Sequence, residues 1–205
     1  KASMESNGVK VSVGGPFDTV LGYKKFSVNK DNYVFFSDDS RISADVRLRA
    51  SDGMGLQVYT NDSTEALQDL TVGLTKFELA SLMTVLPYLP RISGVMNGDF
   101  HVIKTETDLS VSSSIMVNNM TYEGCKMGNI GSEFVYMPKE NNEHYVDGTL
   151  SCNNIEVGTI SGTYSAAGQG ALDANLTLSH TPLSLLNGFI TDQLFGFKGY
   201  CDGDL

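Results

Sequence analysis

The sequence predicts an all-β fold, a meander of antiparallel hairpins interrupted by two short helices. Three observations lead to this prediction. Several segments alternate strictly between apolar and polar residues, as a strand with one dry and one wet face does. Short turns rich in glycine, asparagine or charged residues separate these segments. A leucine-rich stretch that runs into Gly-x-x-x-Gly-Asp occurs twice, which indicates a repeated architectural unit.

Alternation and turn signals place the strands along the chain. In residues 41–50 the apolar side chains share one face and three arginines lie on the other. Because a slip of one residue would expose the apolar set, we expect a well-defined register. Three segments carry the clearest apolar faces: Ile42, Ala44, Val46 and Leu48; Leu109, Val111, Ile115 and Val117; Leu172, Ala174, Leu176 and Leu178. The expected strands are 9–13, 23–28, 33–37, 41–50, 56–60, 70–77, 109–117, 133–137, 145–152, 157–165 and 172–178.

The two repeated segments break the alternation and predict short amphipathic helices at about 79–90 and 182–192. Apolar residues there recur every three or four positions, the spacing of one helix face. Thr181-Pro182 is a helix-start signal, and Pro87 and Pro90 limit the first helix to about two turns. The predicted apolar helix face consists of Leu82, Val85, Leu86, Leu183, Leu186 and Phe189. We expect each helix to cover the apolar face of the sheet or one end of it.

The Gly-x-x-x-Gly-Asp motif begins at Gly94 and again at Gly199, 105 positions apart (199 − 94). We expect it to act as a glycine hinge that turns the chain from the helix into the next strand. The repeat divides the chain into a first β unit (1–78), a short helix (79–93), a second β unit (94–179), and a helix with the start of another unit (180–205). On this division, residues 1–205 are expected to be a fragment of a longer repeated protein.

Composition excludes several classes of function. A net charge of −10 and a pI near 4.6 argue against nucleic acid or an anionic membrane surface as a partner. No apolar run reaches the roughly 18 residues of a membrane span, and there is no signal-peptide pattern. Three cysteines without metal-ligand spacing favour small buried thiols, although one Cys125–Cys152 bridge stays open as an alternative; Cys201 is the third.

Signals for catalysis are weak, so we expect no enzyme, no catalytic residue, no metal site and no cofactor. His101, His144 and His180 belong to no zinc or triad motif. No serine lies in a nucleophile elbow. The acidic pairs near residues 38 and 202 lack the ligand spacing of a calcium loop and are expected to be solvated turns.

The second repeated segment resembles the recurring signature of TamB-like proteins of the AsmA-like superfamily, the translocation and assembly module of the diderm bacterial envelope. Residues 183–190 and 194–205 carry it, reading Leu-Ser-Leu-Leu-Asn-Gly-Phe-Ile and Leu-Phe-Gly-Phe-Lys-Gly-Tyr-Cys-Asp-Gly-Asp-Leu. Residues 117–130 are similar to that family's strand-turn phrase, with Met127 and Ile130 in leucine places. The resemblance covers about residues 70–205, and the first copy departs from it at residues 90–94.

The resemblance implies a long curved antiparallel sheet forming an open, apolar-lined, taco-like groove. It also implies a periplasmic segment of an envelope-biogenesis protein whose parent is anchored in the inner membrane. Such a segment would bind phospholipid acyl chains and help carry phospholipid between inner and outer membranes. Alternatively, it would support outer-membrane protein assembly, with an outer-membrane barrel protein as partner. The three apolar strand faces are the expected lining of the groove.

Two alternatives remain open from the residues themselves. The alternating faces also fit the ordinary core of a closed sandwich or barrel. A secreted β-sandwich of that kind would recognise glycan or protein through exposed aromatics, for which the candidates are Tyr33, Phe35, Tyr59, Tyr136 and Tyr145. The absence of tryptophan counts against the glycan-binding module, because such modules rely on large aromatic platforms.

Overall fold

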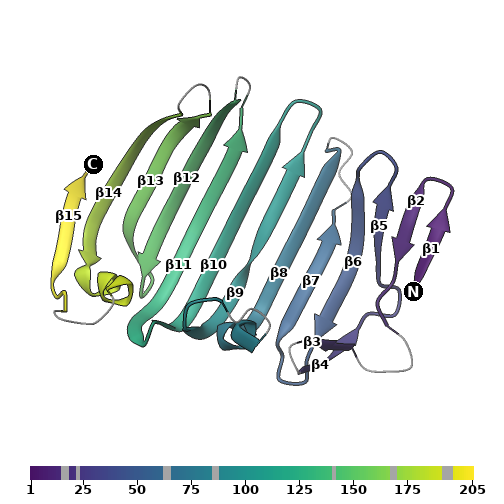
Figure 1. The fold of residues 1–205 in the computed structure, drawn as a ribbon, viewed down its shortest axis with the longest axis horizontal. Coiled ribbons are helices and arrows are strands. Elements are labelled where there is room, and N and C mark those ends of the chain that lie inside the picture. Colours follow the sequence, from purple (N-terminus) through teal and green to yellow (C-terminus); the bar gives the residue numbers. More distant parts are fainter. Residues whose placement is uncertain are drawn as a thin grey trace. The chain divides into compact units, whose positions relative to one another are not determined.

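A computed structural model of the chain describes residues 1–14, 19–21, 24–61, 66–84, 88–139, 142–166, 170–190 and 196–205. It confirms the all-β prediction. The strands form one open, antiparallel, 15-stranded sheet, in which chain order and sheet order agree except at β3 and β4 (Figure 1). β1 and β15 are its two edges. The sheet is therefore a meander, as the succession of short turns predicts.

The strands extend further than the sequence predicts, above all in the second half of the chain, where they reach 14 residues. Four observed strands are absent from the expected ranges: β1, β3 and β15, which are short, and β9, which has 13 residues. The bounds are β1 Ala2–Glu5, β2 Gly8–Val11, β3 Thr19–Leu21, β4 Lys24–Val28, β5 Tyr33–Ser37, β6 Ile42–Arg49, β7 Gly55–Thr60, β8 Gln68–Glu78, β9 Ile92–Lys104, β10 Leu109–Tyr122, β11 Cys125–Pro138, β12 Glu143–Cys152, β13 Ile155–Ser165, β14 Ala171–Pro182 and β15 Tyr200–Asp204.

The chain separates into two compact units. The first unit contains Lys1–Phe77 and Asn97–Val111, and the second contains Glu78–Met96 and Ser112–Leu205. β9 and β10 each contribute residues to both units. The two units are described separately below.

In the first unit, cross-strand pairing collects apolar residues on one face of the sheet. Residues paired directly across antiparallel strands point to the same side. One row of partners runs Met4, Val9, Phe36 and Ile42 from β1 to β6, and another runs Val46, Val58 and Val72 from β6 to β8. The register thus follows the apolar pattern, because any slip would turn these rows toward the polar side.

A small closed core lies at one end of this face. Phe26 from β4 packs with Ala50 and Met54 from the β6–β7 turn, and each is at most 5% exposed. Leu48 and Phe77 pack against them. The β3–β4 hairpin therefore covers the end of the face to which Leu48 belongs.

In the second unit, β11 to β14 pair in register over most of their length. The rows of partners alternate large apolar side chains with small residues: Phe134, Gly148, Ile160 and Leu176; Tyr136, Val146, Gly162 and Ala174; Ser132, Leu150, Gly158 and Leu178. Glycines beside bulky side chains let the neighbours fill the space that a Cβ would take. The opposite face carries mostly polar residues, such as Thr149, Thr159 and Thr177, which pair with one another.

The two predicted helices are present as short 3₁₀-helices, η1 (Leu79–Thr84) and η3 (Leu183–Phe189). Both begin within one residue of the predicted start. They are shorter than predicted, since the backbone is no longer helical at Ile190 after η3 or at residues 88–90 after η1. A 3₁₀-helix rarely exceeds a few residues, because its hydrogen bonds are poorly aligned.

The same hydrogen bond precedes each helix. Three residues before η1, Lys76 adopts a φ of 47°, and its N–H donates to Oδ1 of Asn97 at 2.8 Å. Three residues before η3, His180 adopts a φ of 46°, and its N–H donates to Oδ1 of Asp202 at 2.6 Å. We call this arrangement an Asx clamp: a strand residue with positive φ is held by an Asn or Asp side chain of the next strand.

The clamp explains the repeated sequence. Asn97 and Asp202 occupy the same place in the two copies, directly before the second glycine of Gly-x-x-x-Gly-Asp. The expected glycine hinge is wrong for the first copy, because Gly94 and Gly98 both lie inside the continuous strand β9. A Cβ at Gly94 would come within 2.7 Å of the Val117 side chain, so this glycine permits close packing of strands inside the sheet.

Candidate apolar binding face

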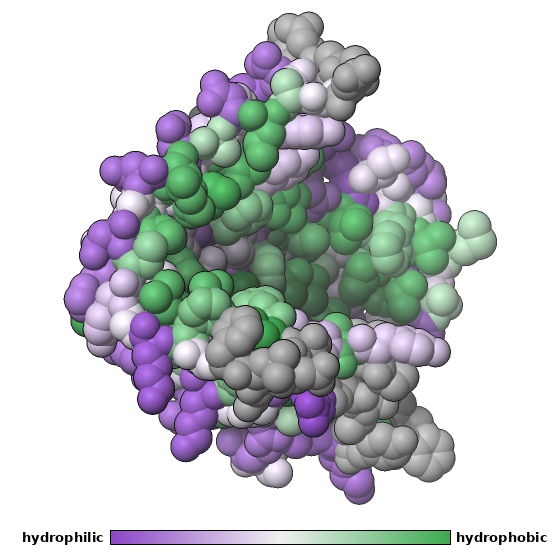
Figure 2. Space-filling model, turned by 60° about the vertical axis from the view of Figure 1, so that its left-hand side comes forward, coloured by the Kyte–Doolittle hydropathy of each residue, from purple (hydrophilic) through white to green (hydrophobic). Residues whose placement is uncertain are grey.

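The apolar face of the second unit is formed by residues of β11 to β14 that share one side of the sheet. Its members are Ile130, Ser132, Phe134, Tyr136, Pro138, His144, Val146, Gly148, Leu150, Cys152, Ile155, Gly158, Ile160, Gly162, Tyr164, Leu172, Ala174, Leu176 and Leu178. None of them is Asp, Glu, Lys or Arg. Figure 2, in which the C-terminal strands come forward, shows hydrophobic side chains gathered on one side of these strands and hydrophilic ones on the other.

Several large side chains of this face are exposed to solvent. Leu172 is 74% exposed, Tyr164 44% and Ile160 43%. In the core of a closed sandwich such residues would be covered by a second sheet. Among the described residues no large side chain is fully buried, and only ten hydrophobic residues count as core. The closed-core alternative is therefore wrong, because the sheet leaves one face open.

The predicted lining residues of β14 all belong to this face. Leu172, Ala174, Leu176 and Leu178 pair with Tyr164, Gly162, Ile160 and Gly158 of β13. In β10, Met116 lies beside Gly131, which pairs with Ser151 on the opposite face. Ile115 and Val117 alternate with Met116 and so point to the apolar side, and Val117 is 7% exposed.

The structure places the other predicted lining residues in the first unit. Ala44 and Val46 are buried, at 2% and 9% exposure, while Ile42 and Leu48 are half-buried at the two ends of β6. Leu109 and Val111 are half-buried in β10. Sequence reasoning missed the partners of β6 on this face, such as Val34, Phe36, Leu56 and Val58, because it did not assign the strand pairing.

The predicted helix face is only partly described. Val85 and Leu86 lie outside the described residues, as does the side chain of Leu82. In η3, Leu183 is half-buried, whereas Leu186 and Phe189 are 46% and 67% exposed.

η3 crosses several strands of the second unit. It directly follows β14, yet the Phe189 ring lies 5.0 Å from the Tyr122 ring at the end of β10. A Cβ at Gly188 would approach the same tyrosine ring within 2.8 Å. In sheet order, β14 is four strands from β10, which corresponds to roughly 19 Å in a flat sheet. η3 therefore bridges the strands at that end, where β11 also contacts it.

A polar and aromatic cluster lies at the other end of the apolar face. The Tyr136 hydroxyl and Nδ1 of His144 are 2.7 Å apart, and the two rings stack at 5.8 Å. His144 pairs with Tyr164, whose ring lies 6.0 Å from the imidazole. Sequence reasoning treated His144 as isolated, because only the register brings it between two tyrosines.

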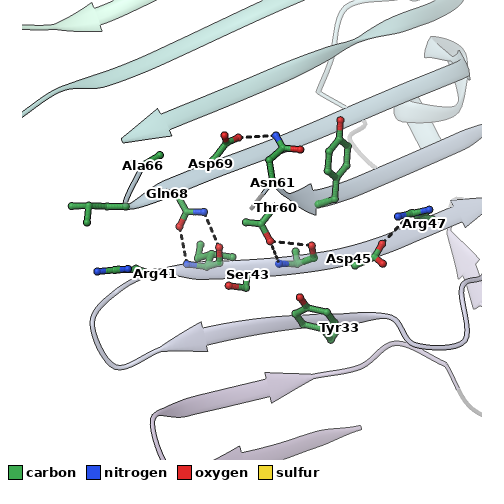
Figure 3. A pocket seen from close by; sticks show the side chains of 14 residues that line it. Tyr33, Arg41, Ser43, Asp45, Arg47, Thr60, Asn61, Ala66, Gln68 and Asp69 are labelled. Carbon is green, nitrogen blue, oxygen red and sulfur yellow. Dashed lines mark hydrogen bonds and ion pairs between the residues drawn. The ribbon is translucent and has the colours of Figure 1, made fainter. Parts of the chain in front are cut away.

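A second polar feature, the polar notch, lies in the first unit where β7 ends (Figure 3). Side chains replace backbone pairing to β6 at this point. The Gln68 amide accepts from the N–H of Ile42 at 2.8 Å and donates to its carbonyl at 2.7 Å. The Thr60 hydroxyl likewise accepts from the N–H of Ala44 at 2.9 Å and donates to its carbonyl at 3.2 Å. The notch has a volume of about 400 Å³, and its two carboxylates, Asp45 and Asp69, are already bonded within the protein.

The ionisable groups of the notch are held by local hydrogen bonds. His101 Nε2 lies 2.7 Å from Asp69 Oδ1, and Asn61 donates to the same oxygen at 2.8 Å. The bond with His101, followed by that with Asn61, lowers the pKa of Asp69. This carboxylate therefore remains charged at neutral pH and acts as a structural acceptor.

The five candidate aromatics do not form one platform. Tyr33 and Tyr59 both pair with Asp45, so they lie on the polar side of the first unit, as does Phe35. Tyr136 lies on the apolar face of the second unit, and Tyr145 lies on the opposite side under Lys139. Three of the five candidates thus share the polar face of the first unit, and the other two lie on opposite faces of the second.

None of the three cysteines forms a disulfide bond. Cys152 is buried on the apolar face, and burial raises the pKa of its thiol. Within the described ranges, no group of three or more His, Cys, Asp or Glu side chains could hold a metal ion. Over the same ranges, no helix is long and apolar enough to cross a membrane.

No protein-family model, curated protein or solved structure matches this chain.

Proposed function

We propose that this chain is a segment of an open β-groove that binds the acyl chains of phospholipids. In this proposal it serves a periplasmic protein of the bacterial envelope that carries phospholipid between membranes or supports outer-membrane protein assembly. The observation that carries the proposal is the apolar face of the second unit, which contains no Asp, Glu, Lys or Arg and leaves Leu172 74% exposed. The sequence resemblance to TamB-like proteins supports the envelope setting.

The physical basis is the burial of hydrocarbon. Each methylene moved from water to an apolar surface contributes about 0.8 kcal/mol, so several methylenes suffice for binding without a dedicated polar group. From Leu178 to Leu172 the face extends about 20 Å along β14, because a strand rises about 3.3 Å per residue. An acyl chain laid on the face would also cover side chains that water now contacts.

Photo-crosslinking tests the proposal. A photoreactive side chain at Leu176 lies on the apolar face, and one at Thr177 lies on the opposite face of the same strand as a matched control. After expression in a diderm bacterium and irradiation, mass spectrometry should find phospholipid attached at position 176 and not at position 177. Equal labelling at both positions, or none at 176, would contradict the proposal.

A further inference from the structure

The polar groups on the apolar face of the second unit are concentrated at one end. Tyr136, His144 and Tyr164 lie on three adjacent strands, near the end of β11, at the start of β12 and near the end of β13. Between this cluster and the η3 end, the face offers mainly aliphatic side chains, Phe134 and glycines. A ligand lying along the strands would therefore meet hydrocarbon over most of its length and hydrogen-bonding groups at one end only.

The exposure of the side chains also changes along the face, from the η3 end to the end with His144. Cys152, at the η3 end of β12, is 7% exposed, although its partner Ile155 at the turn is 66% exposed; beside His144, Tyr164 and Leu172 are 44% and 74% exposed. Protein thus covers part of the face toward η3, whereas the end with His144 is open to water. An amphiphile gains most when its tail occupies the more covered, aliphatic part and its polar head remains at the open end.

The cluster has hydrogen-bonding capacity that the described part of the protein does not use. Nδ1 of His144 is occupied by the Tyr136 hydroxyl. When Nδ1 accepts a hydrogen bond from the Tyr136 hydroxyl, the ring hydrogen of the neutral imidazole is on Nε2, which is then a hydrogen-bond donor. In the described ranges, neither this Nε2 nor the Tyr164 hydroxyl has a hydrogen-bond partner.

We propose that Tyr136, His144 and Tyr164 form the head-group site of the bound amphiphile and select a phosphate-bearing head over an uncharged one. Nε2 of His144 and the Tyr164 hydroxyl donate hydrogen bonds to the phosphate oxygens, and Tyr136 fixes the orientation of the imidazole. Hydrogen bonds to a charged acceptor are stronger than those to a neutral hydroxyl, which is the source of the selection. This inference rests on the proposed function, because it assigns the head of the ligand whose tail binds the apolar face.

Calorimetric titration with two probes of equal chain length, decyl phosphate and decanol, tests the site. The wild-type chain should bind decyl phosphate about tenfold more tightly than decanol. The double variant His144→Asn with Tyr164→Phe should reduce that preference to about twofold or less, whatever its effect on the affinity for decanol itself.

A second histidine and tyrosine of the same unit provide the control. His180 and Tyr200 stack at 3.8 Å, and both are exposed. The variant His180→Asn with Tyr200→Phe should keep the preference for decyl phosphate. If decanol binds and no preference exists, or if the His144 variant retains it, the head-group site is refuted. If neither probe binds, the proposed acyl-binding function fails together with it.

Discussion

At the scale of single residues, glycines on the apolar face of the second unit set how closely the strands pack. A Cβ at Gly162 would lie 2.5 Å from the carbonyl oxygen of Asp173 and 2.7 Å from Cα of Ala174. A Cβ at Gly158, on the same strand and face, would meet nothing closer than 3.5 Å. The sequence shows two glycines four residues apart, and only the pairing with β14 distinguishes them.

Gly162→Ala should lower the free energy of unfolding by about 1–3 kcal/mol, because the backbone of β14 must shift to admit the methyl group. Gly158→Ala should change it by less than about 0.5 kcal/mol. Urea denaturation followed by circular dichroism measures both. Equal losses in the two variants would show that the clash at Gly162 does not determine the cost.

Asp69 gives a residue-scale prediction about pH. Its pKa is lowered from 3.8 by the hydrogen bonds from His101 and Asn61, so its charged form stabilises the folded chain above the unfolded-state pKa. This contribution is lost as pH falls through the lowered pKa. Asp69→Asn should therefore lose less stability than wild type between pH 7 and pH 2.

Urea midpoints at the two pH values check this prediction. Asp173→Asn, a change at an exposed position of the polar face, serves as the control and should follow wild type. An identical loss of stability in Asp69→Asn and wild type would contradict the role assigned to Asp69.

At the scale of elements, the Asx clamp links each 3₁₀-helix to the strand that follows it in the sheet. The leucine spacing predicted both helices and their starting points. Their length and 3₁₀ form could not be predicted, because they depend on where neighbouring strands meet the chain. The positive φ at Lys76 and His180 could not be predicted either, because residues other than glycine rarely adopt it and the acceptor of each N–H lies on another strand.

Removing the clamp acceptor should destabilise the chain in both copies. Asn97→Ala and Asp202→Ala should each lower the free energy of unfolding by about 1 kcal/mol, because an N–H in a strained segment loses its acceptor. Asn97→Asp keeps an acceptor oxygen of the kind found at Asp202 and should cost less than half as much.

Thermal and urea unfolding measure these differences, with Asn175→Ala on the exposed polar face as the control. If Asn97→Asp proved as destabilising as Asn97→Ala, the hydrogen bond from Lys76 would not be the stabilising contact.

At the scale of the whole molecule, an apolar side chain on an open sheet stabilises the fold only where protein covers it. In a closed core, large apolar side chains support the fold. Here Val157 is 3% exposed, whereas Leu172 in the neighbouring strand is 74% exposed. Residues of similar chemistry thus contribute differently, according to whether protein or solvent covers them.

Leu172→Glu should leave the free energy of unfolding within about 0.5 kcal/mol of wild type and reduce the binding of a hydrophobic dye such as ANS. Val157→Glu should destabilise the fold by about 3 kcal/mol or more, because it places an unpaired charge in a buried position. Dye fluorescence and urea unfolding together separate the two effects. Strong destabilisation by Leu172→Glu would contradict an open face.

The sequence by itself determined the all-β class, most strand positions, the three apolar faces and the two helix starts. Each depends on short-range periodicity, which a single chain segment carries. Only the tertiary structure decided that the sheet stays open, that Gly94 and Gly98 lie inside a strand, and that His144 stands between two tyrosines. These features arise from register between strands, and alternation specifies which face a residue occupies without specifying its neighbours on that face.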